Sequence, residues 1–299
     1  MNADRPVLGI MLMLGFCLLA PMGDAVAKLL GDTIPLAQLL LVRFAAQAVL
    51  LLPLVIWGGR TLRMTPRMFR LTLLRTILHI IGIGAMFTAL RFLPLADAIA
   101  IAFVMPFILL LLGKTVLNEQ VGPRRLIACI IGFVGTLLVI QPSFAQVGAP
   151  AMLPLLVALV FALFMLTTRQ IAKETDPIAL QAMSGLIGAP ILLVLTLAGQ
   201  WADLPAASII LPNTREVMML LTIGLLGTGA HLFMTWSLRY APSATLAPMQ
   251  YLEIPVATLI GWLIFRDLPD GSAALGIAIT IGAGFYIIYR EHRSATGHA

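Results

Sequence analysis

Ten long apolar runs restrict what this sequence can fold into more than any other feature. They occupy residues 7–30, 35–57, 70–91, 95–117, 122–141, 151–170, 177–200, 215–238, 243–265 and 272–290. Each has about the length of a membrane-crossing helix, which needs roughly 20 apolar residues. The runs are continuous rather than alternating, which favours helices over barrel strands. With 60% hydrophobic residues, 11% charged residues and a mean hydropathy of +1.02, a water-soluble enzyme is excluded.

The basic residues gather in the loops of one face. With the N-terminus placed in the cytoplasm, thirteen lysines and arginines fall on the cytoplasmic side and four on the other side, while Arg43 and Arg75 lie within spans. Positively charged loops remain on the cytoplasmic side of a membrane. We therefore expect both termini to be cytoplasmic. The net charge of +6 is interpreted as an orientation signal, and no nucleic-acid partner is expected.

One pattern occurs twice, 148 residues apart. The segment LRFLP at residues 90–94 matches LRYAP at residues 238–242, and each is followed by an apolar stretch with an internal proline, Pro106 or Pro255. An acid, Glu119 or Asp267, follows each of these stretches. We expect two five-helix repeats, residues 1–145 and 146–299. Because five is odd, the second repeat enters the membrane from the opposite side, and such inverted repeats favour alternating access to a central site.

The ALRFLP element at residues 89–94, its partner SLRYAP at residues 237–242, the mid-helix prolines and the two acids resemble the EamA-type members of the drug/metabolite transporter superfamily. The resemblance covers essentially the whole chain. It implies an all-α membrane protein with ten transmembrane helices in two inverted repeats. It also implies a central cavity lined mainly by the third, fourth, eighth and ninth helices.

The length and the polar residues look most similar to the YddG-like amino-acid exporters of that family. The resemblance therefore implies a transporter in a bacterial inner membrane rather than an enzyme. The expected activity is export of small metabolites, foremost amino acids and among them aromatic ones, by alternating access. A multidrug or nucleotide-sugar carrier of the same fold is the alternative within this class, and an intramembrane enzyme is the alternative outside it.

Polar and aromatic residues near the middle of the bilayer are the candidates for a substrate site. A charged group there costs about 2.5–3.5 kcal/mol, so such groups usually face a cavity or a partner. The candidate lining comprises His79, Gln250, Tyr251, Glu253, Phe103, Trp236 and His231.

Several of these candidates have a second interpretation. His79 could instead form a hydrogen bond to a neighbouring helix. Glu253 could bind a proton or a cation, or make a structural hydrogen bond. Tyr251 and Phe103 could be packing residues, and Trp236 could be an interfacial anchor.

A second group of residues is expected to be structural or to couple movements. Asp24 and Arg43 lie at comparable depth on neighbouring antiparallel helices, so we expect them to neutralise each other. Pro106 and Pro255 are expected to bend the fourth and ninth helices. The first repeat carries Met105 where the second carries Glu253, which predicts that the two halves recognise substrate differently.

Neither a metal nor a cofactor is expected, because the four histidines show no ligand spacing and both cysteines lie in apolar runs. The expected partners are a small-molecule substrate, an amino acid or similar metabolite, and the lipid bilayer. A homodimer is also possible, because the fifth and tenth helices carry small residues that permit close helix contact.

Overall fold

The structure is a computed structural model that describes residues 5–118, 122–267 and 271–296. The described residues form ten spans. The first three spans are α1 (Pro6–Leu30), α2 (Leu36–Trp57) and α3 (Pro66–Ala89). The fifth, sixth, seventh and eighth spans are, in that order, α6 (Pro123–Val147), α7 (Leu153–Ala172), α8 (Pro177–Trp201) and α9 (Thr214–Tyr240). The tenth is α12 (Gly271–Thr296). This is the expected all-helical membrane fold, although Glu119 lies outside the described residues.

The fourth and ninth spans are each broken, where the sequence predicts single helices. The fourth consists of α4 (Leu95–Ala102) and α5 (Met105–Val116). The ninth consists of α10 (Ser243–Leu246), the 3₁₀ segment η3 (Ala247–Leu252), α11 (Glu253–Ile260) and the π-helical turn η4 (Gly261–Phe265). Pro106 and Pro255 lie in the first turns of α5 and α11, where a missing N–H costs no intrahelical hydrogen bond. The prolines therefore begin the second helical piece instead of bending a continuous helix.

The largest helix contacts join the two halves of the chain. α1 packs on α9, α3 packs on α7, α2 packs on α8, and α6 packs on α12. A two-fold axis that exchanges the halves places the α1–α9 pair on the α7–α3 pair. The same axis places the α2–α8 pair on itself and the α6–α12 pair on itself. The broken spans follow the same rule, because α4 contacts α11 while α5 contacts α10 and η3. This is the contact pattern of an inverted repeat with interleaved halves.

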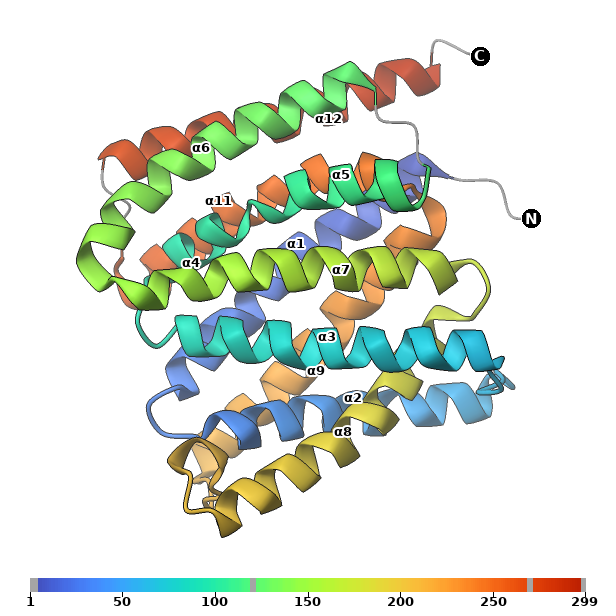
Figure 1. Cartoon of the computed structure of the whole chain (residues 1–299), viewed down its shortest axis with the longest axis vertical. Coiled ribbons are helices and arrows are strands. Elements are labelled where there is room, and N and C mark those ends of the chain that lie inside the picture. Colours follow the sequence, from blue (N-terminus) through green and yellow to red (C-terminus); the bar gives the residue numbers. More distant parts are fainter. Residues whose placement is uncertain (1–4, 119–121, 268–270, 297–299) are drawn as a thin grey trace.

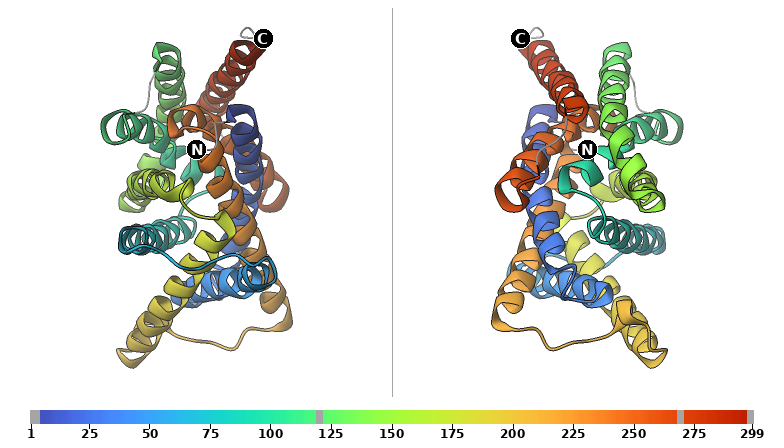
Figure 2. Two further views of the ribbon diagram at one scale, coloured as in Figure 1. Left: turned by 90° about the vertical axis from the view of Figure 1, so that its right-hand side faces the viewer. Right: turned by 90° about the vertical axis from the view of Figure 1, so that its left-hand side faces the viewer.

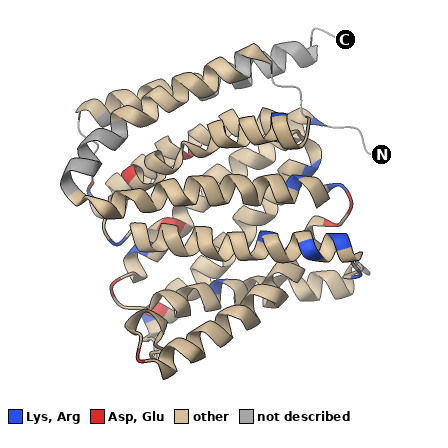
Figure 3. Ribbon diagram, viewed as in Figure 1, with Lys and Arg blue, Asp and Glu red and all other residues tan. Residues whose placement is uncertain are grey.

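Both ends of the described chain lie on one side of the molecule. Figure 1 shows α1 beginning and α12 ending at the right-hand side of the view, as an even number of crossings requires. Figure 2 shows α6 and α12 together at one end of the long axis and α8 at the other. Lysines and arginines gather toward the right-hand side in Figure 3. We call this the terminal side; its placement in the cytoplasm stays a prediction from the charges.

Gly132 and Gly135 of the fifth span pack closely against residues of the same chain, whereas Gly282 of the tenth span has open space around it. A Cβ on Gly135 of α6 would lie 2.7 Å from the Gly276 carbonyl oxygen of α12 and 2.5 Å from Thr280 Oγ1. A Cβ on Gly132 would lie 2.5 Å from the ring of Tyr251. These glycines permit close packing inside one molecule, so they no longer argue for a homodimer.

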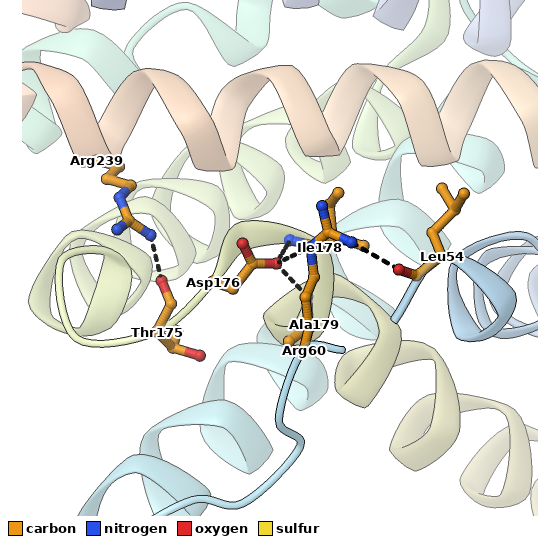
Figure 4. A network of polar contacts seen from close by, with 7 residues as sticks. All are labelled: Leu54, Arg60, Thr175, Asp176, Ile178, Ala179 and Arg239. Atoms are coloured by element: carbon orange, nitrogen blue, oxygen red, sulfur yellow. Dashed lines mark hydrogen bonds and ion pairs between the residues drawn. The ribbon is translucent and has the colours of Figure 1, made fainter. Parts of the chain in front are cut away.

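A polar network on the terminal side fixes the start of α8. Asp176 accepts hydrogen bonds from the backbone N–H groups of Ile178 at 3.0 Å and Ala179 at 3.1 Å, and its carboxylate lies 3.3 Å from Arg60 Nε (Figure 4). Arg60 also donates to the Leu54 carbonyl oxygen at 2.7 Å. Asp176 is therefore both the N-cap of α8 and a link between the two halves.

Replacing Asp176 with alanine is expected to destabilise the protein by about 1 kcal/mol, the typical value of an N-cap. The ion pair with Arg60 adds less, because both side chains are a third or more exposed. Asp176→Asn keeps an oxygen that can accept the capping bonds, so it should lose only a small part of this stability. Thermal unfolding in detergent measures both variants, and equal losses would contradict the capping role.

Candidate functional site

A central cavity of about 60 Å³ lies between the two halves. Three aromatic side chains, Phe16, Phe103 and Phe161, and the apolar residues around them form most of its wall. Its ionisable lining consists of Asp24 on α1, Arg43 on α2, His231 on α9 and Glu253 on α11. The cavity is smaller than the roughly 150 Å³ engineered cavity that holds one benzene molecule. It offers space for a few water molecules in this conformation.

The breaks of the fourth and ninth spans border this cavity. Phe103 lies in the break between α4 and α5, Met105 begins α5, and Glu253 begins α11. Met105 and Glu253 hold equivalent positions in the two repeats and both line the cavity, one apolar and one acidic. The resemblance implied a lining mainly from the third, fourth, eighth and ninth helices, but α1 and α7 contribute as well.

Arg43 is held by neutral groups at the cavity wall. Its Nη2 lies 3.0 Å from Nδ1 of His231, and its guanidinium carbon lies 6.0 Å from the ring centre of Phe87. Nδ1 of His231 also lies 3.0 Å from the Gly227 carbonyl oxygen, so it accepts from the guanidinium in one neutral tautomer and donates to that carbonyl oxygen in the other. Gly227 presents bare backbone to the guanidinium, so the arginine can approach α9 closely.

The expected ion pair between Asp24 and Arg43 is not formed. Within the described chain, no ion pair within 4.0 Å joins the two residues. Both side chains nevertheless line the same cavity, and Asp24 is only partly buried. The sequence placed the two charges at one depth, but Arg43 reaches past α1 to His231 because Gly227 leaves space there. A positive and a negative group therefore face the same cavity without a direct contact, and their opposite charges attract each other across it.

His79 lies one layer behind the cavity wall. Its ring centre is 4.2 Å from that of His231, 4.7 Å from Phe164 and 5.1 Å from Phe44. The residue is 1% exposed, and neither of its ring nitrogens has a hydrogen-bond partner in the described structure. The alternative of an interhelical hydrogen bond is therefore not observed, and His79 contacts the cavity only through His231.

Gln250 and Tyr251 point away from the cavity, contrary to the expectation. Gln250 Nε2 lies 2.9 Å from Met165 Sδ on α7, and the Tyr251 hydroxyl donates to the Cys129 carbonyl oxygen of α6 at 3.2 Å. The Tyr251 ring covers Gly132, where a side chain would leave no room. A buried phenol needs an acceptor, and α6 supplies both the acceptor and the space. Tyr251 is therefore a packing residue.

Trp236 is also placed away from the cavity. It packs with Leu232 against a small apolar cluster that includes Leu51, Val55 and Ile178. Its ring centre lies 6.3 Å from that of Phe233. Its depth near the inner end of the helix is typical of an interfacial anchor, and depth alone does not determine which side of α9 a residue occupies.

Sequence reasoning missed two interior residues. Phe161 on α7 lines the cavity, and nothing in its sequence neighbourhood distinguishes it from other apolar residues. Arg75 on α3 is completely buried among polar side chains of α7, α8 and α9. The signal for Arg75 was present, because a charge within an apolar run marks a functional candidate.

Polar contacts join the two halves at both ends of the molecule. On the terminal side, Arg67 donates to Glu174 at 2.7 Å, in addition to the Arg60–Asp176 pair. On the opposite side, Lys28 Nζ lies 3.9 Å from Asp267 Oδ2. The two pairs on the terminal side are exposed or partly exposed and each contributes about 0–1 kcal/mol, whereas the Lys28 side chain is 19% exposed and its contact with Asp267 is long. The ion pairs can therefore break at either end at low cost, while two hydrogen bonds between Gln38 and the Ile210 backbone, at 2.9 and 3.0 Å, also join the halves on the opposite side.

Comparisons with known proteins agree with this architecture. A family model described as the EamA-like transporter family matches the chain twice, over residues 7–141 and 149–289. A crystal structure with 16% sequence identity has the same fold, with a TM-score of 0.71 over 97% of this chain and 98% of that chain.

Relatives with assigned names are transporters rather than enzymes. An S-adenosylmethionine uptake transporter of Rickettsia prowazekii is 25% identical over 271 residues, which cover 91% of this chain and 89% of that protein. A riboflavin transporter of Rhizobium johnstonii is 31% identical over 221 residues, which cover 74% of this chain and 70% of that protein. This multi-pass membrane protein belongs to the EamA-like transporter family.

Proposed function

We propose that the protein carries a metabolite that combines an aromatic heterocycle with an amino-acid end, and that S-adenosylmethionine represents this class. The lining of the central cavity carries the proposal. Arg43 complements a carboxylate, for which a guanidinium is the preferred partner. Asp24 and Glu253 complement an ammonium and a sulfonium. Phe16, Phe103 and Phe161 offer rings on which an adenine can stack.

The names of the relatives support an aromatic heterocycle, because adenine and the flavin ring are both fused nitrogen heterocycles. None of the relatives described above is named for amino-acid export, so that expectation finds no support in them. The proposed class keeps one part of that expectation, because S-adenosylmethionine contains an amino-acid group. Riboflavin is the second candidate, favoured by the aromatic wall and by the 31% identical relative. It carries no charge that would require Arg43, Asp24 and Glu253 together.

Transport requires the halves to move, because a cavity of about 60 Å³ cannot hold such a molecule. The inverted repeat supplies two equivalent movements, one opening each end. The ion pairs between the halves at the surface are weak, whereas opening the terminal side also separates Arg75 from its four hydrogen-bond acceptors in the second half. Alternating access around the central cavity is therefore the mechanism we propose.

Counterflow in proteoliposomes tests the substrate class. Vesicles loaded with unlabelled S-adenosylmethionine should accumulate the labelled compound, and excess riboflavin, tryptophan or phenylalanine should compete more weakly than S-adenosylmethionine itself. Vesicles without protein are the blank. Exchange of riboflavin without exchange of S-adenosylmethionine would favour the second candidate. Exchange of amino acids alone would restore the expectation from sequence.

Gly227 provides a test of the cavity wall. A methyl group at this position would collide with the guanidinium of Arg43 and displace it from His231, so Gly227→Ala should lower exchange about tenfold, the effect of one bond to a charged group. Gly229→Ala is the matched control, because its nearest neighbour there is Leu19 at 3.4 Å. Similar exchange rates for the two variants would contradict this role of Gly227.

A further inference from the structure

Arg75 occupies an unusual position for a charged residue in a membrane protein. It lies on α3, nine residues from Pro66, which corresponds to about 14 Å of helix from the terminal side. Its side chain is completely buried. Its guanidinium donates hydrogen bonds to four neutral oxygens, which we call the Arg75 cage: Thr168 Oγ1, Ser184 Oγ, Gln181 Oε1 and Thr235 Oγ1.

The cage satisfies the N–H groups of Arg75 but leaves its charge uncompensated. Among the described residues, no carboxylate lies within 4.0 Å of the guanidinium. The nearest charge-stabilising contact is the ring of Phe164, whose centre is 4.8 Å from the guanidinium carbon. Charged groups inside a membrane normally pair with an opposite charge or line a polar path. The described chain supplies no counter-ion for Arg75.

All four cage oxygens belong to the other half of the chain. Thr168 lies on α7, Gln181 and Ser184 lie on α8, and Thr235 lies on α9, whereas Arg75 belongs to the first half. When the halves separate on the terminal side, the guanidinium loses these partners together. The movement that opens a path from the terminal side therefore also exposes the unpaired positive charge of Arg75 to that path.

The groups between the central cavity and Arg75 are polar and poorly satisfied. His79 is one helical turn from Arg75 and contacts His231 of the cavity wall, while Thr235 of the cage donates to the His231 carbonyl oxygen at 2.7 Å. Both ring nitrogens of His79, Nε2 of His231 and the amide nitrogen of Gln181 have no hydrogen-bond partner in the described structure. Buried polar atoms without partners are costly, so these residues are suited to a state in which water or a ligand reaches them.

We propose that Arg75 is a second binding site for the acidic group of the substrate, between the central cavity and the terminal side. The cage holds the guanidinium while this side is closed. After the halves separate, the substrate carboxylate leaves Arg43, passes the two histidines and pairs with Arg75 in place of the cage. This inference rests on the proposed function, because it assumes a substrate with an acidic group.

Counterflow with two substrates tests the role of Arg75. S-adenosylmethionine and its decarboxylated analogue share every group except the carboxylate. Arg75→Gln should lower exchange of S-adenosylmethionine about tenfold or more, since a bond to a charged group is lost, and should change exchange of the analogue less than about twofold. Equal losses for both compounds would overturn the proposal and leave Arg75 a structural link between the halves.

Two further variants test the proposal if the Arg75→Gln protein does not fold. Arg75→Lys keeps the charge but loses the two-pronged geometry that suits a carboxylate, so the preference for S-adenosylmethionine over the analogue should fall. Ser184→Ala removes one cage oxygen and leaves Arg75 in place, so this preference should not change. A lowered preference in Ser184→Ala, or an unchanged one in Arg75→Lys, would contradict the proposal. Wild-type protein that exchanges neither compound would instead reject the proposed function itself.

Discussion

Replacing Arg43 with glutamine is expected to lower exchange of S-adenosylmethionine by about tenfold to a hundredfold, because a hydrogen bond to a charged group contributes roughly 1.5–3 kcal/mol. Arg43 is 5% exposed and is the one arginine in the cavity lining of the described structure. Glutamine retains a donor but removes the charge. Equilibrium binding of labelled S-adenosylmethionine should weaken by a similar factor, since we propose the cavity as the primary binding site.

The decarboxylated analogue separates recognition of the carboxylate from a general loss of structure. It lacks the group that Arg43 is proposed to hold, so Arg43→Gln should affect it much less. Glu253→Gln is the complementary variant and should weaken both compounds, because both keep the ammonium and the sulfonium. Arg70→Gln, a substitution of an exposed arginine on α3, is the neutral control. Parallel losses of both compounds in Arg43→Gln would refute its role in carboxylate recognition.

The sequence predicted the fold because the bilayer imposes simple requirements. A span must be long, apolar and internally hydrogen-bonded, and these properties can be read from each run separately. The start of the seventh span is an example, since Asp176 and Pro177 form a standard N-terminal pair and α8 begins there. The repeat of LRFLP and LRYAP likewise indicated the inverted symmetry that the helix contacts display.

The candidate site was predicted only in part, because depth alone does not specify a direction. Glu253, His231 and Phe103 line the cavity, as the cost of burying polar groups suggested for the first two. Tyr251 was at the right depth but turned toward Gly132, a position on another helix that no local pattern connects with it. Trp236 failed for the same reason, since its neighbours come from α2 and α8.

For charged residues too, the sequence does not reveal which partners a side chain contacts. Arg75 was recognisable as a charge within a span, but its four acceptors come from three helices and lie 93 to 160 residues later in the sequence. Only the packing of α3 on α7 and α8 reveals that the acceptors converge. The interior of this protein is therefore specified by contacts between the halves. The repeat in the sequence indicates that such contacts exist but does not identify the residues that make them.

Replacing Gly185 with alanine is expected to destabilise the protein by about 1–2 kcal/mol and to disturb the Arg75 cage. A Cβ at this position would lie 2.7 Å from the backbone nitrogen and 3.0 Å from the Cα of Ala48, so α2 and α8 would have to move apart. Overpacking of this kind costs about 1–3 kcal/mol, which outweighs the gain of up to about 1 kcal/mol from alanine in a helix.

The cage is affected because Ser184 precedes Gly185, and because Gln47 on α2 donates to the Gln181 carbonyl oxygen of α8 at 2.6 Å. Gly282→Ala is the matched control, since a Cβ there meets no atom within 4 Å and should leave stability unchanged or slightly higher. Thermal unfolding of both variants in detergent measures the difference. If Gly185→Ala melts at or above the wild-type temperature, the close approach of α2 and α8 is not required for stability.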